Sequence, residues 1–380
     1  MPVFGPTRAA LAAAAARGAD ILPSLRLVLT AEALTAPPPP RALELNAELD
    51  ALCAAVRELA DCRAGWLYFC PAYAPLPAAV PYLTKENIKS QKQTKKLVQN
   101  LQASVVSGSA LYVAVEEDGG GENSISAKVE DLKDTGYVTP KEMGQNMTAN
   151  QIYESGKTIA GELTKIGINL NLAPVADLAS DQNPSYAMRC LGSDADGVAD
   201  LLDDFVSGMR EGGLSVTLKT FPGIGNVSAD VTESIAENTD SLMTIRDTNF
   251  VPYASGIQAG ADCVMVSNAA YSKLTVKKVP AFMSQDIVTK LLREELGFDG
   301  IVMTSPLNDN VIENNYTNEF AVVEAVKAGC DLIVLPGNFK ECYEALITAV
   351  EEGRIDEKVI NTSVRRILQN KIQRGILVLE

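Results

Sequence analysis

The feature that most constrains the fold is an alternation of short apolar runs with longer amphipathic stretches, which begins after residue 80. Six runs are almost wholly apolar and rich in β-branched residues: 111–115, 168–175, 215–218, 263–266, 301–304 and 332–335. The stretches between them have helical length and periodicity, as at 151–166, 195–211, 284–296 and 319–328. Apolar strands that alternate with helices predict a parallel sheet that is buried on both faces.

Glycines mark the ends of the predicted helices, as expected where a chain leaves a helix in a left-handed conformation. They are Gly167, Gly213, Gly260, Gly297 and Gly329. Two further strands are expected upstream, at 82–83 and 66–69. Six strands alone do not distinguish a barrel from an open sheet. Together with the two upstream strands they favour a (β/α)8 TIM-type barrel over residues 81–380, which is incomplete or irregular at its N-terminal strands.

Residues 1–80 differ in composition from the rest of the chain and form an Ala/Pro-rich extension of unknown role. Residues 12–16 are all alanine, and residues 37–40 are all proline. Leucines recur at helical spacing in residues 41–62, so this segment is expected to supply a helix, and residues 66–69 a strand. We expect residues 1–40 to be poorly packed, because Ala and Pro have little side-chain area to bury.

Charge and composition exclude several classes of function. The net charge is −15 and the pI is about 4.7, which disfavours nucleic acid or an anionic membrane surface as a partner. No apolar run approaches the roughly 18 residues of a membrane span. The chain has no histidine, so Ser-His-Asp catalysis and histidine metal sites are excluded. Cys263 and Cys330 lie in apolar strand contexts and are expected to be core residues.

In a parallel barrel, functional side chains follow the carboxyl ends of the strands. The polar residues at those places are Glu116, Asp177, Lys219, Asn268 and Ser305. We therefore expect Asp177, Lys219 and Ser305 to converge at one end of the barrel.

Six segments around these strand ends resemble glycoside hydrolase family 3, in its β-N-acetylhexosaminidase branch, and they occur in the order of the family's motifs. They are VAVEEDGGG, NLNLAPVADL, MRCLGSD, LKTFPGIGN, LGFDGIVMTS and AVKAGCDLIVLPG, between residues 113 and 337. The resemblance implies a barrel domain, a carbohydrate ligand such as an amino sugar or a β-glycoside, and no cofactor or metal.

The chain departs from this family at the positions that carry catalysis. The nucleophilic Asp of the family corresponds to Ser305, which has no charge. The acid/base His corresponds to Thr232, which cannot relay a proton near neutral pH, although the Asp that supports that His is retained as Asp230. The candidate catalytic positions are therefore Ser305, Thr232 and Asp230, and the first two lack the residue that the family has there.

The positions that contact sugar in the family are retained. Arg189 and Lys219 match the family's Arg and Lys, Asp177 matches its strand-end Asp, and Glu116 replaces an Asp that binds sugar hydroxyls. The resemblance therefore implies that these four bind substrate. The alternative is that Arg189 and Lys219 only pair with Asp177 or Glu116 in the barrel mouth.

Two classes of function follow. The first is a sugar-binding member of the family in which hydrolysis is weakened or lost. The second is an active retaining glycosidase acting on terminal N-acetylglucosamine with relocated carboxylates, for which Glu233 and Asp309 are candidates. No metal site is expected, because Asp194 and Asp196 are typical of a helix start. The family acts in the cytoplasm and outside the cell. Cytoplasm is the default expectation, and an extracellular location stays open.

Overall fold

The computed structural model describes residues 66–68, 80–84, 87–103, 110–120, 124–127, 137–224, 226–227, 230–334 and 339–377. The predicted helix at 41–62 and the poorly packed segment 1–40 lie outside these residues. Within the described part of the chain, no helix is long and apolar enough to cross a membrane.

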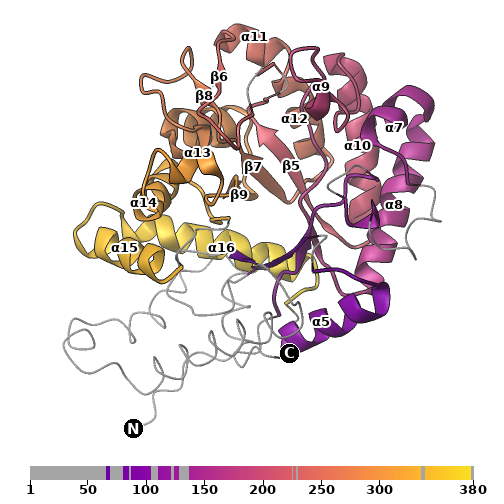
Figure 1. The fold of residues 1–380 in the computed structure, drawn as a ribbon, viewed down its shortest axis with the longest axis horizontal. Helices are drawn as coiled ribbons and strands as arrows, with labels where there is room; N and C mark the ends of the chain where they lie inside the picture. Colours follow the sequence, from indigo (N-terminus) through magenta and orange to yellow (C-terminus); the bar gives the residue numbers. More distant parts are fainter. Residues whose placement is uncertain are drawn as a thin grey trace.

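A curled, mostly parallel sheet forms the centre of the molecule, with helices on its outside (Figure 1). Its strands pair in the order β1 (Trp66–Tyr68), β2 (Val80–Leu83), β3 (Ala114–Val115), β4 (Leu170–Asn171), β5 (Ser215–Phe221), β7 (Cys263–Val266) and β9 (Ile301–Thr304). From β2 to β9 every pairing is parallel. A bridge from Met303 to Leu332 continues this order. No pairing among the described residues joins Leu332 to β2, so the fold is the predicted barrel in an incomplete form.

The prediction that residues 66–69 form a strand of a parallel βα unit was wrong in its direction. Residues 66–68 form β1, but β1 pairs antiparallel to β2. A parallel connection needs a crossover of a dozen or more residues, usually a helix. The connecting residues 69–79 are too few, and they include Pro71, Pro75 and Pro77, which disfavour a helix.

The helices around the sheet include all four predicted stretches, at 151–166, 195–211, 284–296 and 319–328. The α-helices are α5 (Gln91–Ala103), α7 (Pro140–Asn146), α8 (Ala149–Lys165), α9 (Pro184–Ala187), α10 (Ala195–Glu211), α11 (Leu242–Asp247), α12 (Phe250–Gln258), α13 (Asn310–Glu313), α14 (Asn318–Ala328), α15 (Phe339–Glu351) and α16 (Glu357–Gln373). Two short 3₁₀ segments are η2 (Ile125–Ala127) and η3 (Ala281–Met283). The predicted helix at 284–296 is a π-helix, η4 (Asp286–Glu295). All five predicted helix-ending glycines have positive φ, and Gly329 caps α14 at φ 111°.

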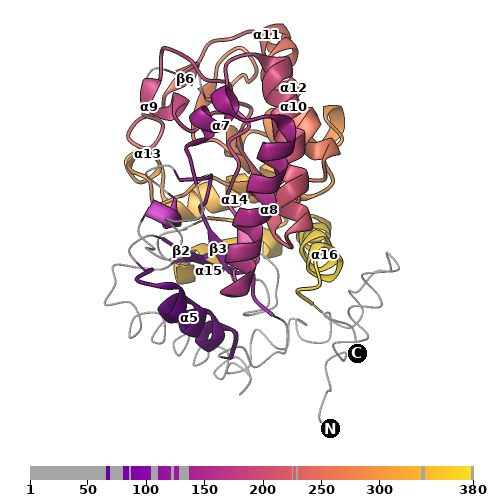
Figure 2. The ribbon, with the colours of Figure 1, turned by 90° about the vertical axis from the view of Figure 1, so that its right-hand side faces the viewer.

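Two glycines allow α8 and α10 to pack backbone against backbone along the outside of the sheet (Figure 2). A Cβ on Gly156 would lie 2.6 Å from the carbonyl oxygen of Phe205, and one on Gly208 would lie 2.1 Å from that of Tyr153. Both distances are shorter than any real Cβ contact. This close helix pair therefore requires glycine at both positions.

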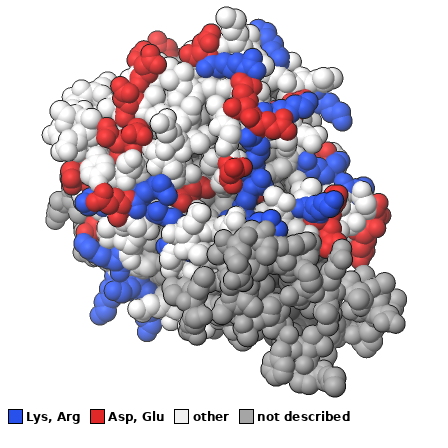
Figure 3. All heavy atoms as spheres, turned by 180° about the vertical axis from the view of Figure 1, so that it is seen from behind, with Lys and Arg blue, Asp and Glu red and all other residues white. Residues whose placement is uncertain are grey.

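The core is continuous and apolar, and the surface charge is mixed. Cys263 and Cys330 are fully buried free thiols, as predicted. On the face opposite to that of Figure 1, basic side chains of the described residues lie among acidic ones (Figure 3). A distribution of this kind is typical of a solvated surface.

Candidate functional site

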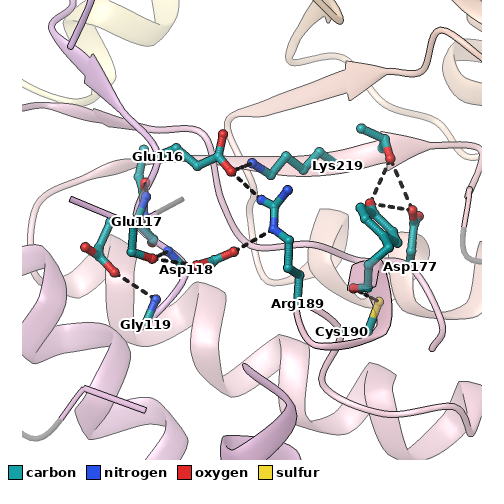
Figure 4. A network of polar contacts seen from close by, with 12 residues as sticks. Glu116, Glu117, Asp118, Gly119, Asp177, Arg189, Cys190 and Lys219 are labelled. Atoms are coloured by element: carbon teal, nitrogen blue, oxygen red, sulfur yellow. Dashed lines mark hydrogen bonds and ion pairs between the residues drawn. The ribbon is translucent and has the colours of Figure 1, made fainter. Parts of the chain in front are cut away.

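A cluster of two cations and two carboxylates lies at the carboxyl end of β3 and β5 (Figure 4). The Arg189 side chain follows α9 and forms an ion pair with Glu116. Its Nε atom donates to Asp118 Oδ2 at 3.0 Å. Lys219 Nζ lies 3.1 Å from the same Glu116 oxygen that Arg189 contacts. The structure thus brings together Glu116, Arg189 and Lys219. The pairing of both cations with Glu116 fits a sugar site and the structural alternative alike.

The loop after β3 is fixed by Asn171 and Glu117. The Asn171 amide accepts from the backbone N–H of Glu117 at 2.9 Å and donates to its carbonyl at 2.8 Å. The Glu117 carboxylate accepts from the N–H groups of Gly119 (2.9 Å) and Ser126 (2.8 Å). These contacts hold the backbone that carries Glu116 and Asp118. Sequence reasoning did not identify Asn171 as a positioning residue, although it lies in the NLNLAPVADL motif.

Burial controls the ionisation of this cluster. Burial opposes ionisation of Asp118, but Arg189 and Lys219 hold the pKa of that carboxyl below its usual value. Burial lowers the pKa of Lys219 to about 8, while Glu116 acts in the opposite direction. Burial also raises the pKa of Glu117 to about 7, although its backbone donors favour the ionised form. The two cations and the Asp118 carboxylate are therefore charged at neutral pH.

Asp177 is fully buried behind this cluster, and both of its oxygens are occupied. Oδ2 accepts from the Tyr186 hydroxyl (2.8 Å), Thr220 Oγ1 (3.1 Å) and the Ile224 N–H (3.0 Å). Oδ1 accepts from the Tyr253 hydroxyl at 3.0 Å. Burial raises the pKa of Asp177, and these hydrogen bonds oppose that shift. The geometry favours an anchoring role for Asp177. The two tyrosines were not identified from the sequence, since no local pattern connects them to this carboxylate.

Ser305 lies at the carboxyl end of β9, on the same sheet edge as Lys219 and Asp177. It is 6% exposed, and both its N–H and its hydroxyl donate to the carbonyl oxygen of Val266 at 2.9 Å. The hydroxyl is therefore turned toward the neighbouring strand.

Thr232 and Asp230 lie on an exposed loop. The Thr232 hydroxyl donates to Asp230 Oδ1 at 2.7 Å, and its N–H donates to the same oxygen at 2.8 Å. The loop is attached to the start of α13, because Val311 N–H donates to the Thr232 carbonyl at 2.8 Å. α13 begins five residues after Ser305, so the two candidate catalytic positions, Ser305 and Thr232, belong to adjoining segments.

Asp309, the residue before α13, is half-buried beside Asn268. Asn268 Nδ2 donates to Asp309 Oδ2 at 2.8 Å. Burial first, and then the negative charge of Asp230, raise the pKa of Asp309 to about 7. Glu233 accepts from Asn310 Nδ2 at 2.8 Å, so the two relocated-carboxylate candidates lie on the same pair of segments.

No group of three or more carboxylate or cysteine side chains in the described part of the chain is arranged to hold a metal ion. Asp194 accepts from the Gly197 N–H at 2.8 Å as the N-cap of α10, as its sequence context predicted.

The fold and the cluster define the class of this protein as an incomplete α/β barrel with charged side chains at the carboxyl ends of its strands. The family model described as the Glycosyl hydrolase family 3 N terminal domain matches residues 78–370. Because this match covers most of the chain, the protein belongs to glycosyl hydrolase family 3. The family predicted from the sequence motifs is confirmed.

Among the curated relatives that the chain matches are β-hexosaminidases. A β-hexosaminidase of Xylella fastidiosa (strain M23) is 32% identical over 183 residues, which are 48% of this chain and 54% of the relative. A β-hexosaminidase of Stenotrophomonas maltophilia is 28% identical over 300 residues, which are 78% of this chain and 84% of the relative. The match to the Xylella protein thus spans only about half of that protein's length.

Solved structures of the family confirm the fold. A glycoside hydrolase family 3 β-N-acetylglucosaminidase from Paenibacillus has 30% identity and a TM-score of 0.73, over 78% of this chain and 57% of that one. A β-N-acetylhexosaminidase from Beutenbergia cavernae has 29% identity and a TM-score of 0.65, over 74% of this chain and 85% of that one.

Proposed function

We propose that this protein binds an amino sugar at the Glu116–Arg189–Lys219 cluster and that it has lost most or all glycosidase activity. The observation that carries the binding proposal is the shared Glu116 oxygen, which Arg189 and Lys219 both contact while Glu116 and Arg189 remain 16% and 20% exposed at their side chains. Charged donors and acceptors at the edge of a pocket form hydrogen bonds with the neighbouring hydroxyl groups of a sugar.

The loss of hydrolysis follows from the chemistry of the two missing groups. A retaining glycosidase needs a carboxylate that stabilises an oxocarbenium-like transition state and then bonds to the anomeric carbon. The Ser305 hydroxyl is neutral and donates to a backbone carbonyl. General acid help, worth roughly 10²–10⁴-fold, is also missing at Thr232. Both losses affect the same reaction.

Calorimetry with N-acetylglucosamine tests the binding proposal. We expect Arg189→Ala to abolish measurable affinity and Arg189→Lys to weaken it, because lysine lacks the planar fork with which arginine presents Nη2 to Glu116 and Nε to Asp118. Arg354→Ala, at an exposed arginine paired with Glu352, is the matched control and should bind as the parent does. Unchanged affinity in Arg189→Ala would remove Arg189 from the site. A parent that binds no sugar would favour the purely structural pairing.

Turnover of a nitrophenyl N-acetylglucosaminide tests the second half of the proposal. A parent rate of about 1 s⁻¹ or more would be typical of an enzyme and would contradict it. The alternative is an active glycosidase with relocated carboxylates. The half-buried Asp309, with its pKa near 7, is the observation that favours this alternative. In that case Asp309→Asn and Glu233→Gln should each reduce the rate.

A further inference from the structure

Asn268 has a buried polar atom that nothing in the fold explains. It follows β7 and is 1% exposed. Its Nδ2 atom donates to Asp309 Oδ2 at 2.8 Å and approaches the Pro306 carbonyl at 3.4 Å. Its Oδ1 atom is buried and has no hydrogen-bond partner among the residues that the structure describes. Buried side-chain acceptors are usually paired, so an unpaired one beside a functional position indicates a missing ligand group or water.

The second polar group at this place is the Asp309 carboxyl. Oδ2 is occupied by Asn268, while Oδ1 has no hydrogen bond from any residue that the structure describes. The charged groups that face Asp309 are all acidic: Asp230 and Glu233 on the loop before β6 (Glu237–Asn238), and Glu313 on α13. A carboxyl surrounded by like charges retains its proton to a higher pH and can then donate a hydrogen bond.

The location of this pair connects it to the sugar site. Pro306 follows Ser305, and the N–H of Ser305 donates to Val266 of β7, two residues before Asn268. Asn268 and Asp309 therefore lie at the barrel end that carries Lys219, beside the position at which the family has its nucleophile. The exposed loop that carries Asp230 and Glu233 is held at this end of the barrel by the contacts of Thr232 and Glu233 with α13.

We propose that Asn268 and Asp309 form a subsite that binds one hydroxyl group of the sugar, with Asp309 as the donor and Asn268 Oδ1 as the acceptor. A hydroxyl both donates and accepts, so it satisfies both partners. The Asn268 amide is oriented by its Nδ2 atom, which faces Asp309 Oδ2 and the Pro306 carbonyl. A metal ion fits less well, because the described residues offer no group of three carboxylate or cysteine ligands here. An anion would be repelled by the surrounding carboxylates. This inference rests on the proposed sugar binding.

The test is calorimetry with N-acetylglucosamine at pH 6 and pH 8. Since Asp309 must be protonated to donate, the parent should bind roughly tenfold more tightly at pH 6, where the protonated fraction is about ten times larger. Asp309→Asn keeps a donor at every pH. Its affinity should therefore match that of the parent at pH 6 and change less than about twofold at pH 8. Lys219 and Glu117 also titrate in this interval, so only the difference between the parent and Asp309→Asn is assigned to the subsite.

Two further variants complete the design. Asn268→Ala removes the acceptor and should weaken binding at least fivefold at both pH values. Glu351→Gln, at an exposed acid of α15 that is not among the charged groups facing Asp309, is the control and should keep the pH dependence of the parent. Circular dichroism at each pH checks that the variants are folded.

The outcomes separate the two proposals. Sugar binding by the parent with unchanged affinity in Asn268→Ala, or with the same pH dependence in Asp309→Asn, overturns the subsite and leaves the Glu116–Arg189–Lys219 proposal intact. No sugar binding by the parent at either pH overturns both.

Discussion

At the scale of single residues, the proposed loss of glycosidase activity rests on Ser305 and Thr232, and the family residue can be restored at both positions. Ser305→Asp with Thr232→His rebuilds the family's catalytic pair beside the retained Asp230. Thr232 is exposed and already contacts Asp230, so a histidine can be placed there without repacking. Ser305 is buried, and an aspartate there must turn away from the Val266 carbonyl.

We expect the double variant to release nitrophenol from a nitrophenyl N-acetylglucosaminide when the parent does not. Each single variant should remain near the background rate, because nucleophile and acid act on the same bond. Steady-state absorbance measures the rate. An inactive double variant that still binds N-acetylglucosamine would show that the sugar is seated out of reach of residue 305.

Asp309 gives a prediction about stability and pH. Its folded pKa, about 7, lies above its unfolded value, so the unfolded state loses the proton first as pH rises. The contribution of protonated Asp309 to the free energy of unfolding is therefore complete below about pH 4 and is lost between about pH 4 and pH 7. At 1.36 kcal/mol per pKa unit, discounted for solvent, the loss is on the order of 1–3 kcal/mol.

The comparison that isolates this effect is the free energy of urea unfolding at pH 5 and pH 8. Asp309→Asn should lose less stability between these values than the parent. The difference is informative because Glu117, which also has a raised pKa, is present in both proteins. An equal decrease in both would mean that Asp309 ionises normally.

At the scale of elements, α16 closes the amino end of the barrel. It passes below β5, β7 and β9 (Figure 1). Its Asn370 side chain donates to Asp262 Oδ1 at 2.7 Å and accepts from the Tyr112 hydroxyl at 2.5 Å. Arg366, one turn earlier, donates to the buried Asp331 at 3.2 Å. These contacts join the starts of three strand segments to one helix.

Asn370→Ala should therefore destabilise the fold by about 2–4 kcal/mol, because it leaves the Tyr112 hydroxyl and an Asp262 oxygen without this partner in a buried site. Thr362→Ala, on the exposed face of the same helix, should change stability by less than about 0.5 kcal/mol. Thermal and urea unfolding measure both. Similar effects of the two substitutions would show that the polar network does not fix α16.

At the scale of the whole molecule, the family match begins at residue 78, and the sheet starts with the antiparallel strand β1. We expect deletion of residues 1–40 to shift the melting temperature by less than about 2 °C, since 1 kcal/mol corresponds to about 2–4 °C in proteins of 150–250 residues. Deletion of residues 1–79 should lower it further, because the backbone of β2 loses the hydrogen bonds of β1. Differential scanning calorimetry compares the three chains. Equal losses in the two deletions would mean that residues 1–40 contribute to the core.

The sequence by itself determined most strands of the central sheet, four of the helices and the family. The bounds of α10 and β9 follow from local apolar periodicity, and the helix-ending glycines follow from backbone sterics, so both can be read from neighbouring residues. The replacements at Ser305 and Thr232 are likewise visible in the chain. Only the tertiary structure decided the antiparallel direction of β1, the four hydrogen bonds that occupy Asp177, and the pairing of Asn268 with Asp309. The physical reason is separation along the chain: Arg189 lies 73 positions from Glu116, and Asn268 lies 41 from Asp309. Contacts of that range depend on how strands return to one edge of a sheet, which no local pattern encodes.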